Sequence, residues 1–134
     1  MSVENTANVE GAVLLIAHGS RREEANLDLV RLADALRARA IFPIVEFAYL
    51  ELAQPTILDG GRACVEQGAR HVSLLPYFLS AGAHVTDDLE QFRCELAGQF
   101  PQVRFNLCKP LSMHPLLIEI VIDRLKEGES TETV

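Results

Sequence analysis

The sequence predicts an α/β fold, and three observations favour it. Four short apolar runs of strand-like composition alternate with four stretches of helical periodicity. The connections between them are short, and no internal repeat or long linker divides the chain. Alternation of this kind builds a parallel sheet with right-handed crossovers and helices on both faces. With four units we expect one domain with the flavodoxin-like strand order 2-1-3-4.

The first half of the chain supplies two strands and two helices. Residues 12–17 have no polar side chain on either face, which is typical of a central strand covered on both sides. We expect the next helix to begin at Ser20, which forms a capping box with Glu23. Residues 43–49 form the second strand. A second helix begins around 54–56, with proline in its first turn.

The second half repeats the alternation. We expect a strand at 71–77, a helix at 85–100, a strand at 103–107 and a final helix at 115–127. A loop that contains glycine joins the third strand to its helix. The domain therefore covers residues 11–127.

Composition excludes several classes of protein. The net charge of −7 argues against a nucleic-acid binder, and no apolar run approaches the roughly 20 residues that cross a bilayer. The polar segments 1–10 and 128–134 are predicted to be disordered, and the first of them lacks the features of a secretory signal. The three cysteines form no C-x-x-C pair, so we expect buried free thiols and a cytoplasmic location.

Two histidines follow predicted strands. His18 directly follows the first strand and precedes Gly19, and His84 closes the loop after the third strand. Ligands of open parallel sheets bind at the carboxyl ends of the strands that flank the topological switch point, so both histidines are expected in one crevice. A neutral imidazole binds metal or accepts a proton. The alternatives are a hydrogen-bonded cap of the sheet for His18 and a solvated loop residue for His84.

Other candidates lie around the same edge. Glu51 lies just beyond the second strand, where it is either a third ligand or a solvated carboxylate. Arg21 and Arg22 occupy a helix start that disfavours cations, so they either bind an anion or pair with neighbouring glutamates. His114 either starts the last helix or lines the rim. His71, at the opposite edge, is expected to be structural or solvated.

The last predicted helix is apolar around nearly its whole circumference. We expect one face to pack on the sheet and the remainder to form a symmetric dimer contact. Its apolar residues are Leu116, Leu117, Ile118, Ile120, Val121, Ile122 and Leu125.

Four blocks of sequence, at 14–21, 47–55, 75–88 and 114–117, resemble in order the short CbiX-type sirohydrochlorin chelatases. The resemblance implies insertion of Co²⁺ or Fe²⁺, with Ni²⁺ a further candidate, into sirohydrochlorin for cobalamin or sirohaem synthesis. The metal is the substrate, and no organic cofactor is implied. The family pattern also implies a homodimer.

The resemblance assigns roles to particular residues. It makes His18 and His84 the paired catalytic, metal-binding histidines, and Glu51 matches the family's acidic position. One departure is the run 87–90, Asp-Asp-Leu-Glu, where an Asp-Ile-Pro-like run is expected. The residues expected to bind the carboxylates and rim of the tetrapyrrole are Ser20, Arg21, Arg22, Gly82 and His114.

Two other functions remain open at this point. A non-catalytic carrier of tetrapyrrole or metal on the same fold would bind without accelerating metal insertion. Phosphate-ester chemistry at the helix start after His18 is less favoured, because the sequence has no arginine before that histidine and no P-loop.

Overall fold

The structure, a computed structural model, describes residues 11–112 and 114–130. It confirms the predicted α/β class. The predicted disordered segment 1–10 and the last residues, 131–134, lie outside the described residues. The elements follow one another as β1 (Gly11–Ala17), α2 (Glu23–Ala38), β2 (Ile44–Tyr49), α3 (Ile57–Glu66), β3 (His71–Pro76), α4 (Ala83–Gln99), β4 (Arg104–Leu107) and α5 (Pro115–Ser130).

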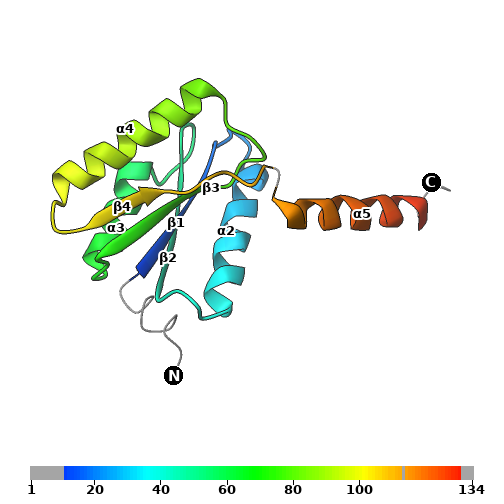
Figure 1. Cartoon of the computed structure of the whole chain (residues 1–134), viewed down its shortest axis with the longest axis horizontal. Helices are drawn as coiled ribbons and strands as arrows, with labels where there is room; N and C mark the ends of the chain where they lie inside the picture. Colours follow the sequence, from blue (N-terminus) through cyan, green and yellow to red (C-terminus); the bar gives the residue numbers. More distant parts are fainter. Residues whose placement is uncertain (1–10, 113, 131–134) are drawn as a thin grey trace.

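The four strands form one parallel sheet in the order β2-β1-β3-β4, as the sequence predicts (Figure 1). Strand β1 pairs with both β2 and β3, and Leu14 lies opposite Glu46 on one side and Leu74 on the other. The chain reverses its direction of travel across the sheet between β1 and β3. The carboxyl ends of these central strands therefore mark the expected binding edge.

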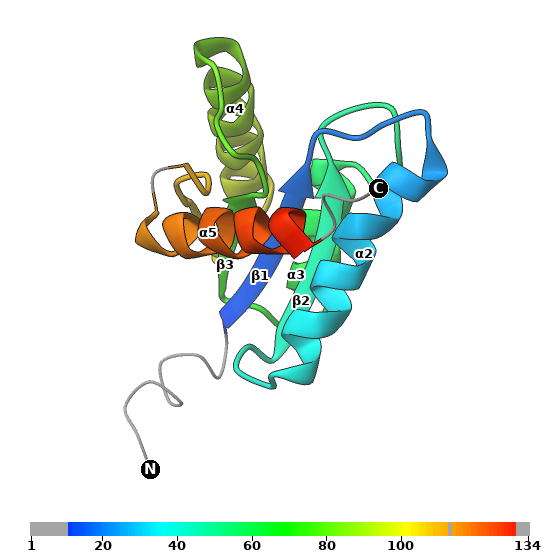
Figure 2. The same ribbon diagram turned by 90° about the vertical axis from the view of Figure 1, so that its right-hand side faces the viewer.

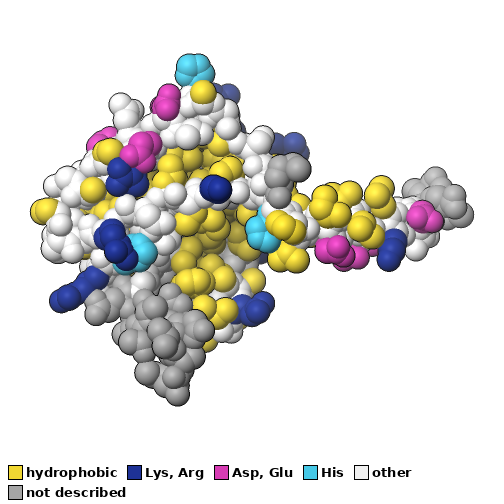
Figure 3. Space-filling view, viewed as in Figure 1, with side chains coloured by type: hydrophobic (Ala, Val, Ile, Leu, Met, Phe, Trp, Pro, Cys, Tyr) yellow, Lys and Arg dark blue, Asp and Glu magenta, His cyan; other side chains and the backbone are white. Residues whose placement is uncertain are grey.

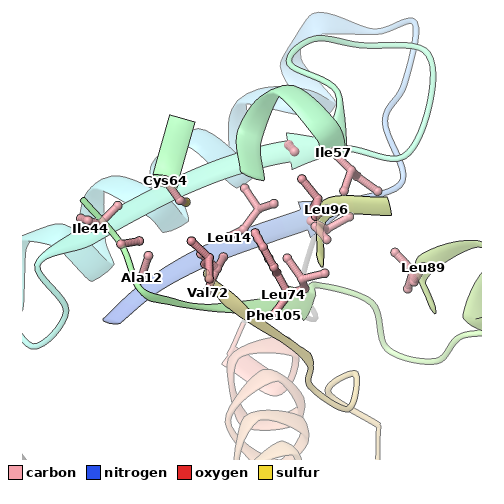
Figure 4. Packing of buried hydrophobic residues seen from close by; sticks show 14 of the residues in the cluster. Ala12, Leu14, Ile44, Ile57, Cys64, Val72, Leu74, Leu89, Leu96 and Phe105 are labelled. Atoms are coloured by element: carbon pink, nitrogen blue, oxygen red, sulfur yellow. The ribbon is translucent and has the colours of Figure 1, made fainter. Parts of the chain in front are cut away.

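Helices α3 and α4 cover one face of the sheet. The core on this side joins alternate residues of β1 and β3 to apolar side chains of the two helices, among them Ile57 and Leu96 (Figure 4). Gly60 and Gly61 bring α3 close to this core. A Cβ atom would lie 2.7 Å from Cδ1 of Leu14 at the first glycine and 2.6 Å from Cδ2 of Leu96 at the second. A Cβ at either position would make these leucine side chains shift, so glycine permits the close packing here, although it weakens the helix.

Helix α2 lies on the other face of the sheet. It packs against β1 and β2 and so covers only part of this face. Its buried residues Leu29 and Ala33 pack against Val13, Leu15 and Val45 of the two strands. Leu75, on the same side of β3, is half-buried. On this face of the sheet, β3 is therefore less fully covered than β1.

Two predicted helix starts are wrong. Helix α2 begins at Glu23 after Arg22, with no side-chain cap, so Ser20 is not its N-cap. Helix α3 begins at Ile57, and Thr56 is the N-cap whose hydroxyl accepts a hydrogen bond from the Asp59 backbone N–H at 3.2 Å. The Thr56 hydroxyl lies next to the first helical residue and can accept this hydrogen bond, whereas a proline side chain has no acceptor.

Helix α5 differs most from its prediction. It projects away from the rest of the chain, and none of its described residues is buried (Figure 1). The prediction that one face of α5 packs on the sheet is therefore wrong for a single copy of the chain. The helix also continues to Ser130, so residues 128–130 are helical where disorder was expected.

Two findings concern other predictions from composition. Cys64 is buried and Cys108 half-buried, but Cys94 is exposed on α4, so the expectation of three buried thiols is wrong for Cys94. Among the described helices, none has the length and apolarity needed to cross a bilayer.

Candidate functional site

His18 lies at the carboxyl end of β1, and its side chain is exposed. One face of the imidazole packs on the ring of Phe78, with ring centroids 4.8 Å apart and planes inclined by 31°. Phe78 is only 7% exposed and belongs to the core on the α3–α4 face. Its backbone oxygen also accepts a hydrogen bond from Leu111 N at 2.9 Å. A buried, anchored ring thus orients an imidazole that remains open to solvent.

Glu51 lies beside His18 because the pairing of β1 and β2 continues past the strands. Leu50 N donates to Ala17 O at 2.9 Å, and Glu51 N donates to His18 O at 3.0 Å. Gly19 makes this approach possible, since it has a φ of +94° and a Cβ there would lie 1.7 Å from Glu51 O. The Glu51 side chain is exposed. The fold therefore brings two of the predicted site residues together.

Ser20 stabilises the loop after β1. Its backbone N–H donates to Asn26 Oδ1 at 2.9 Å, and Asn26 Nδ2 donates back to Ser20 O at 2.8 Å. The Ser20 hydroxyl accepts a hydrogen bond from Arg22 N at 3.0 Å. Tyr49 Oη donates to Asn26 O at 2.6 Å, and burial raises the pKa of this tyrosine. These bonds fix the wall of a hollow of about 270 Å³ whose lining includes His18.

A second hollow, of about 480 Å³, lies beside the first and shares Ser20, Asn26 and Tyr49 with it. Arg21 lines this second hollow, together with the exposed Leu52. Arg22 instead forms an ion pair with Glu24 at 3.3 Å in which both side chains are at least 75% exposed. Such a pair contributes little to stability. Of the two predicted anion-binding arginines, Arg21 therefore lines the hollow of about 480 Å³ and Arg22 is ion-paired.

His84 lies in the first turn of α4, not in the preceding loop as predicted. Gly82 is the N-cap of this helix, and the His84 side chain is exposed. The amino end of α4 lies at the same end of the molecule as the carboxyl end of β1 and extends beyond it (Figures 1 and 2). Over residues 11–112 and 114–130, no three His, Cys, Asp or Glu side chains form a group that could hold a metal ion. The structure thus does not join His84 to His18 and Glu51, and the three-residue metal set stays a prediction.

The remaining histidines have structural contacts. His114 Nδ1 accepts a hydrogen bond from Leu116 N at 3.1 Å, which favours the helix-start alternative for this residue. It also lines an apolar hollow of about 240 Å³ at the base of α5. His71, at the amino edge of the sheet, is hydrogen-bonded to Asn106, in agreement with its predicted structural role.

Sequence reasoning missed Phe78 and Asn26. Phe78 follows a predicted strand directly, as His18 does, and this common position is a signal that could have marked it. Asn26 sits within a helical pattern as an ordinary polar residue, and nothing in the pattern shows that its side chain turns back to Ser20. Both residues act through contacts between segments that are separated in the sequence.

The fold is that of α/β proteins with an open parallel sheet, a class in which ligands bind at the carboxyl edge of the sheet, and an exposed histidine lies at the switch point of this edge. The comparisons with known proteins are more specific. Residues 12–128 match the sequence model of the CbiX family, and the chain belongs to that family.

Two proteins of similar sequence are named as sirohydrochlorin chelatases. The chain is 35% identical over 136 residues to the chloroplastic sirohydrochlorin ferrochelatase of Arabidopsis thaliana, an alignment of 97% of this chain and 60% of that protein. It is 40% identical over 78 residues to the sirohydrochlorin cobaltochelatase of Methanocaldococcus jannaschii, covering 58% and 54% of the two chains. The alignments with this chain cover only 60% and 54% of the lengths of these two relatives.

Solved structures share the fold. The sirohydrochlorin chelatase SirB from Bacillus subtilis subspecies spizizenii, in complex with cobalt, has a TM-score of 0.82 and 31% identity, over 89% of this chain and 51% of that one. A putative cobalamin biosynthesis CbiX protein from Marinobacter aquaeolei has a TM-score of 0.80 and 26% identity, over 90% and 98%. The likeness therefore extends over nearly the whole of this second protein.

Proposed function

We propose that this chain forms a chelatase lobe that inserts a divalent metal ion, as a substrate, into sirohydrochlorin. Membership of the CbiX family supports the reaction class. The single structural observation that most supports it is His18, whose imidazole packs on Phe78 and is exposed beside the Glu51 backbone. An oriented but solvent-accessible imidazole suits transient metal binding better than permanent storage.

The chemistry makes two demands on the site. The metal ion must lose bound waters, and two pyrrole N–H protons must leave the macrocycle. His18 holds the metal on one side of the ring or accepts a proton, and Glu51 and His84 complete the set. Histidine ligands suit Co²⁺, Fe²⁺ and Ni²⁺ better than Mg²⁺ or Ca²⁺. The names of the relatives, which include a ferrochelatase and a cobaltochelatase, make Co²⁺ and Fe²⁺ the first candidates.

Binding of the macrocycle needs local positive charge, because the chain carries a net charge of −7. Arg21 is the first candidate to bind a carboxylate, since it lines the hollow beside His18. Contacts of the substrate with Ser20, Arg22, Gly82 and His114 stay predictions. A cytoplasmic location also stays a prediction.

We further propose that two copies of the chain pair through α5. This helix has six large apolar side chains that are each at least 38% exposed, a surface that a monomer in water rarely presents. Figure 3 shows a second apolar area on the side of the sheet between β4 and α2, near the start of α5. Packing α5 of one copy on this area of the other would cover both surfaces.

A spectroscopic assay tests the activity. Purified protein is mixed with sirohydrochlorin and Co²⁺ or Fe²⁺, and the absorbance change on metal insertion is followed. We expect wild-type protein to accelerate insertion and His18→Ala to lose that acceleration, while the control variant His71→Ala, at the opposite edge of the sheet, retains it. Wild-type turnover no faster than that of His18→Ala would refute the proposal, and tight binding without acceleration would favour the carrier.

Light scattering after gel filtration tests the pairing. We expect a mass of about twice the chain mass of 14.8 kDa. Ile118→Asp places a charge within the apolar surface and should yield monomers, whereas the neighbouring polar change Glu119→Gln should not. A wild-type monomer at micromolar concentration would contradict the proposal.

A further inference from the structure

Leu52 has an unusual combination of backbone conformation and exposure. Its φ is +66°, in the left-handed region that favours glycine and is uncommon for a large side chain. The side chain is also 55% exposed, so the packing gained is not what maintains this conformation. A strained residue of this kind persists where its surroundings fix the backbone, and such residues gather at functional sites.

Hydrogen bonds fix the backbone on both sides of Leu52. The loop between β2 and α3 closes on itself where Tyr49 N donates to Pro55 O at 2.9 Å. The same loop is joined to β1 where Leu50 N and Glu51 N donate to Ala17 O and His18 O. Leu52 follows directly after the residue that is bonded to His18. The loop therefore holds an apolar side chain in solvent next to the candidate metal site.

Leu52 is one of several exposed apolar side chains along this edge. Tyr77 and Leu79, which follow β3, are 39% and 68% exposed. Since the strand order is β2-β1-β3, His18 at the end of β1 lies between these two groups. The ends of β2 and β3 flank the end of β1, so exposed apolar side chains follow the strands on both sides of His18.

This arrangement matches the chemistry of a flat macrocycle that holds a metal at its centre. The exposed apolar side chains on the two sides of His18 are available for contact with such a ring. Leu52 and Arg21 also line the same hollow, so an apolar contact and a cation are available together. A tetrapyrrole that carries carboxylates presents the complementary surfaces, an apolar ring and an anionic rim.

We propose that Leu52 is a substrate-binding residue, held outward in a strained conformation to contact the macrocycle beside the metal site. This inference rests on the proposed function, because it takes the tetrapyrrole as the ligand. It predicts that replacing Leu52 by glycine lowers the affinity for tetrapyrrole without lowering the stability of the fold.

The test uses the whole chain of 134 residues and three variants of Leu52. Leu52→Gly and Leu52→Asn remove the apolar side chain but tolerate the left-handed backbone. We expect each to raise the KM for sirohydrochlorin about ten-fold, with a smaller change in kcat, because an apolar contact is lost from substrate binding. The affinity for Co²⁺ should not change, and the melting temperature of Leu52→Gly should be unchanged or higher. Leu52→Met, which keeps an apolar side chain, should restore most of the affinity.

Ala40→Gly is the matched control. Ala40 is exposed, has a φ of +55° and precedes β2, at the opposite edge of the sheet. Its replacement relaxes the backbone in the same way, and the KM should stay at the wild-type value. A wild-type KM in Leu52→Gly, or a fall in its melting temperature together with its affinity, would overturn the proposal. If wild-type protein binds sirohydrochlorin but inserts no metal, the proposed function fails. The dissociation constants of sirohydrochlorin from wild-type protein, Leu52→Gly and Ala40→Gly then test Leu52, with a rise of about ten-fold expected in Leu52→Gly alone.

Discussion

Gly19 and Gly68 are a matched pair for testing how the site is built. Both have positive φ, +94° and +101°, which L side chains rarely adopt. A Cβ at Gly68 would meet no atom within 4 Å, whereas a Cβ at Gly19 would lie 1.7 Å from Glu51 O. Replacing each by alanine therefore separates backbone strain, which both variants share, from the contact between the loops after β1 and β2.

The expected magnitudes follow from these contacts. Strain at positive φ should cost each variant about 1–3 kcal/mol of unfolding free energy. Gly19→Ala should lose more, because the two loops must move apart. Losing the hydrogen bond from Glu51 N to His18 O costs about 1 kcal/mol, and forcing an extra methyl into the contact costs about 1–3 kcal/mol. We therefore expect Gly19→Ala to be less stable than Gly68→Ala by about 2–4 kcal/mol.

Urea denaturation measures the stability of both variants, and calorimetric titration with Co²⁺ measures metal binding. Gly68→Ala should bind the metal as wild-type protein does, and Gly19→Ala should bind it more weakly because His18 and Glu51 are displaced. Equal losses of stability in the two variants, or wild-type metal binding by Gly19→Ala, would refute the reasoning about this loop contact.

Three further predictions concern the core and the imidazole. Burial raises the pKa of the Cys64 thiol to about 12 from 9.0, so the unfolded chain loses this proton first. Stability should therefore fall as the pH rises from 9 towards 12, and less so in Cys64→Ala, as measured by urea titration. Phe78→Leu should lower the Co²⁺ affinity about 2–10-fold in calorimetry, and Phe92→Leu should not. Gly61→Ala should destabilise the fold through overpacking, whereas Gly98→Ala, with no neighbour within 4 Å, should not, again in urea.

Much of the fold could be predicted because it depends on patterns that are local in the sequence. The uninterrupted apolar run of β1 indicates a central strand, and strand–helix alternation restricts the sheet to few topologies. Helix starts were predicted less well, since Ser20 matches the capping pattern but its backbone bonds to Asn26. Several polar residues satisfy a capping pattern, and packing decides which of them is used.

The sequence by itself determined the α/β class, the strand order and the edge at which His18 and Glu51 lie, because side-chain periodicity and chain connectivity fix these features. Only the tertiary structure decided that Phe78 orients His18, that Leu52 is held outward and that α5 extends away without a buried residue. These features depend on contacts between distant segments. Local pattern does not encode such contacts, since they follow from how the strands and helices pack.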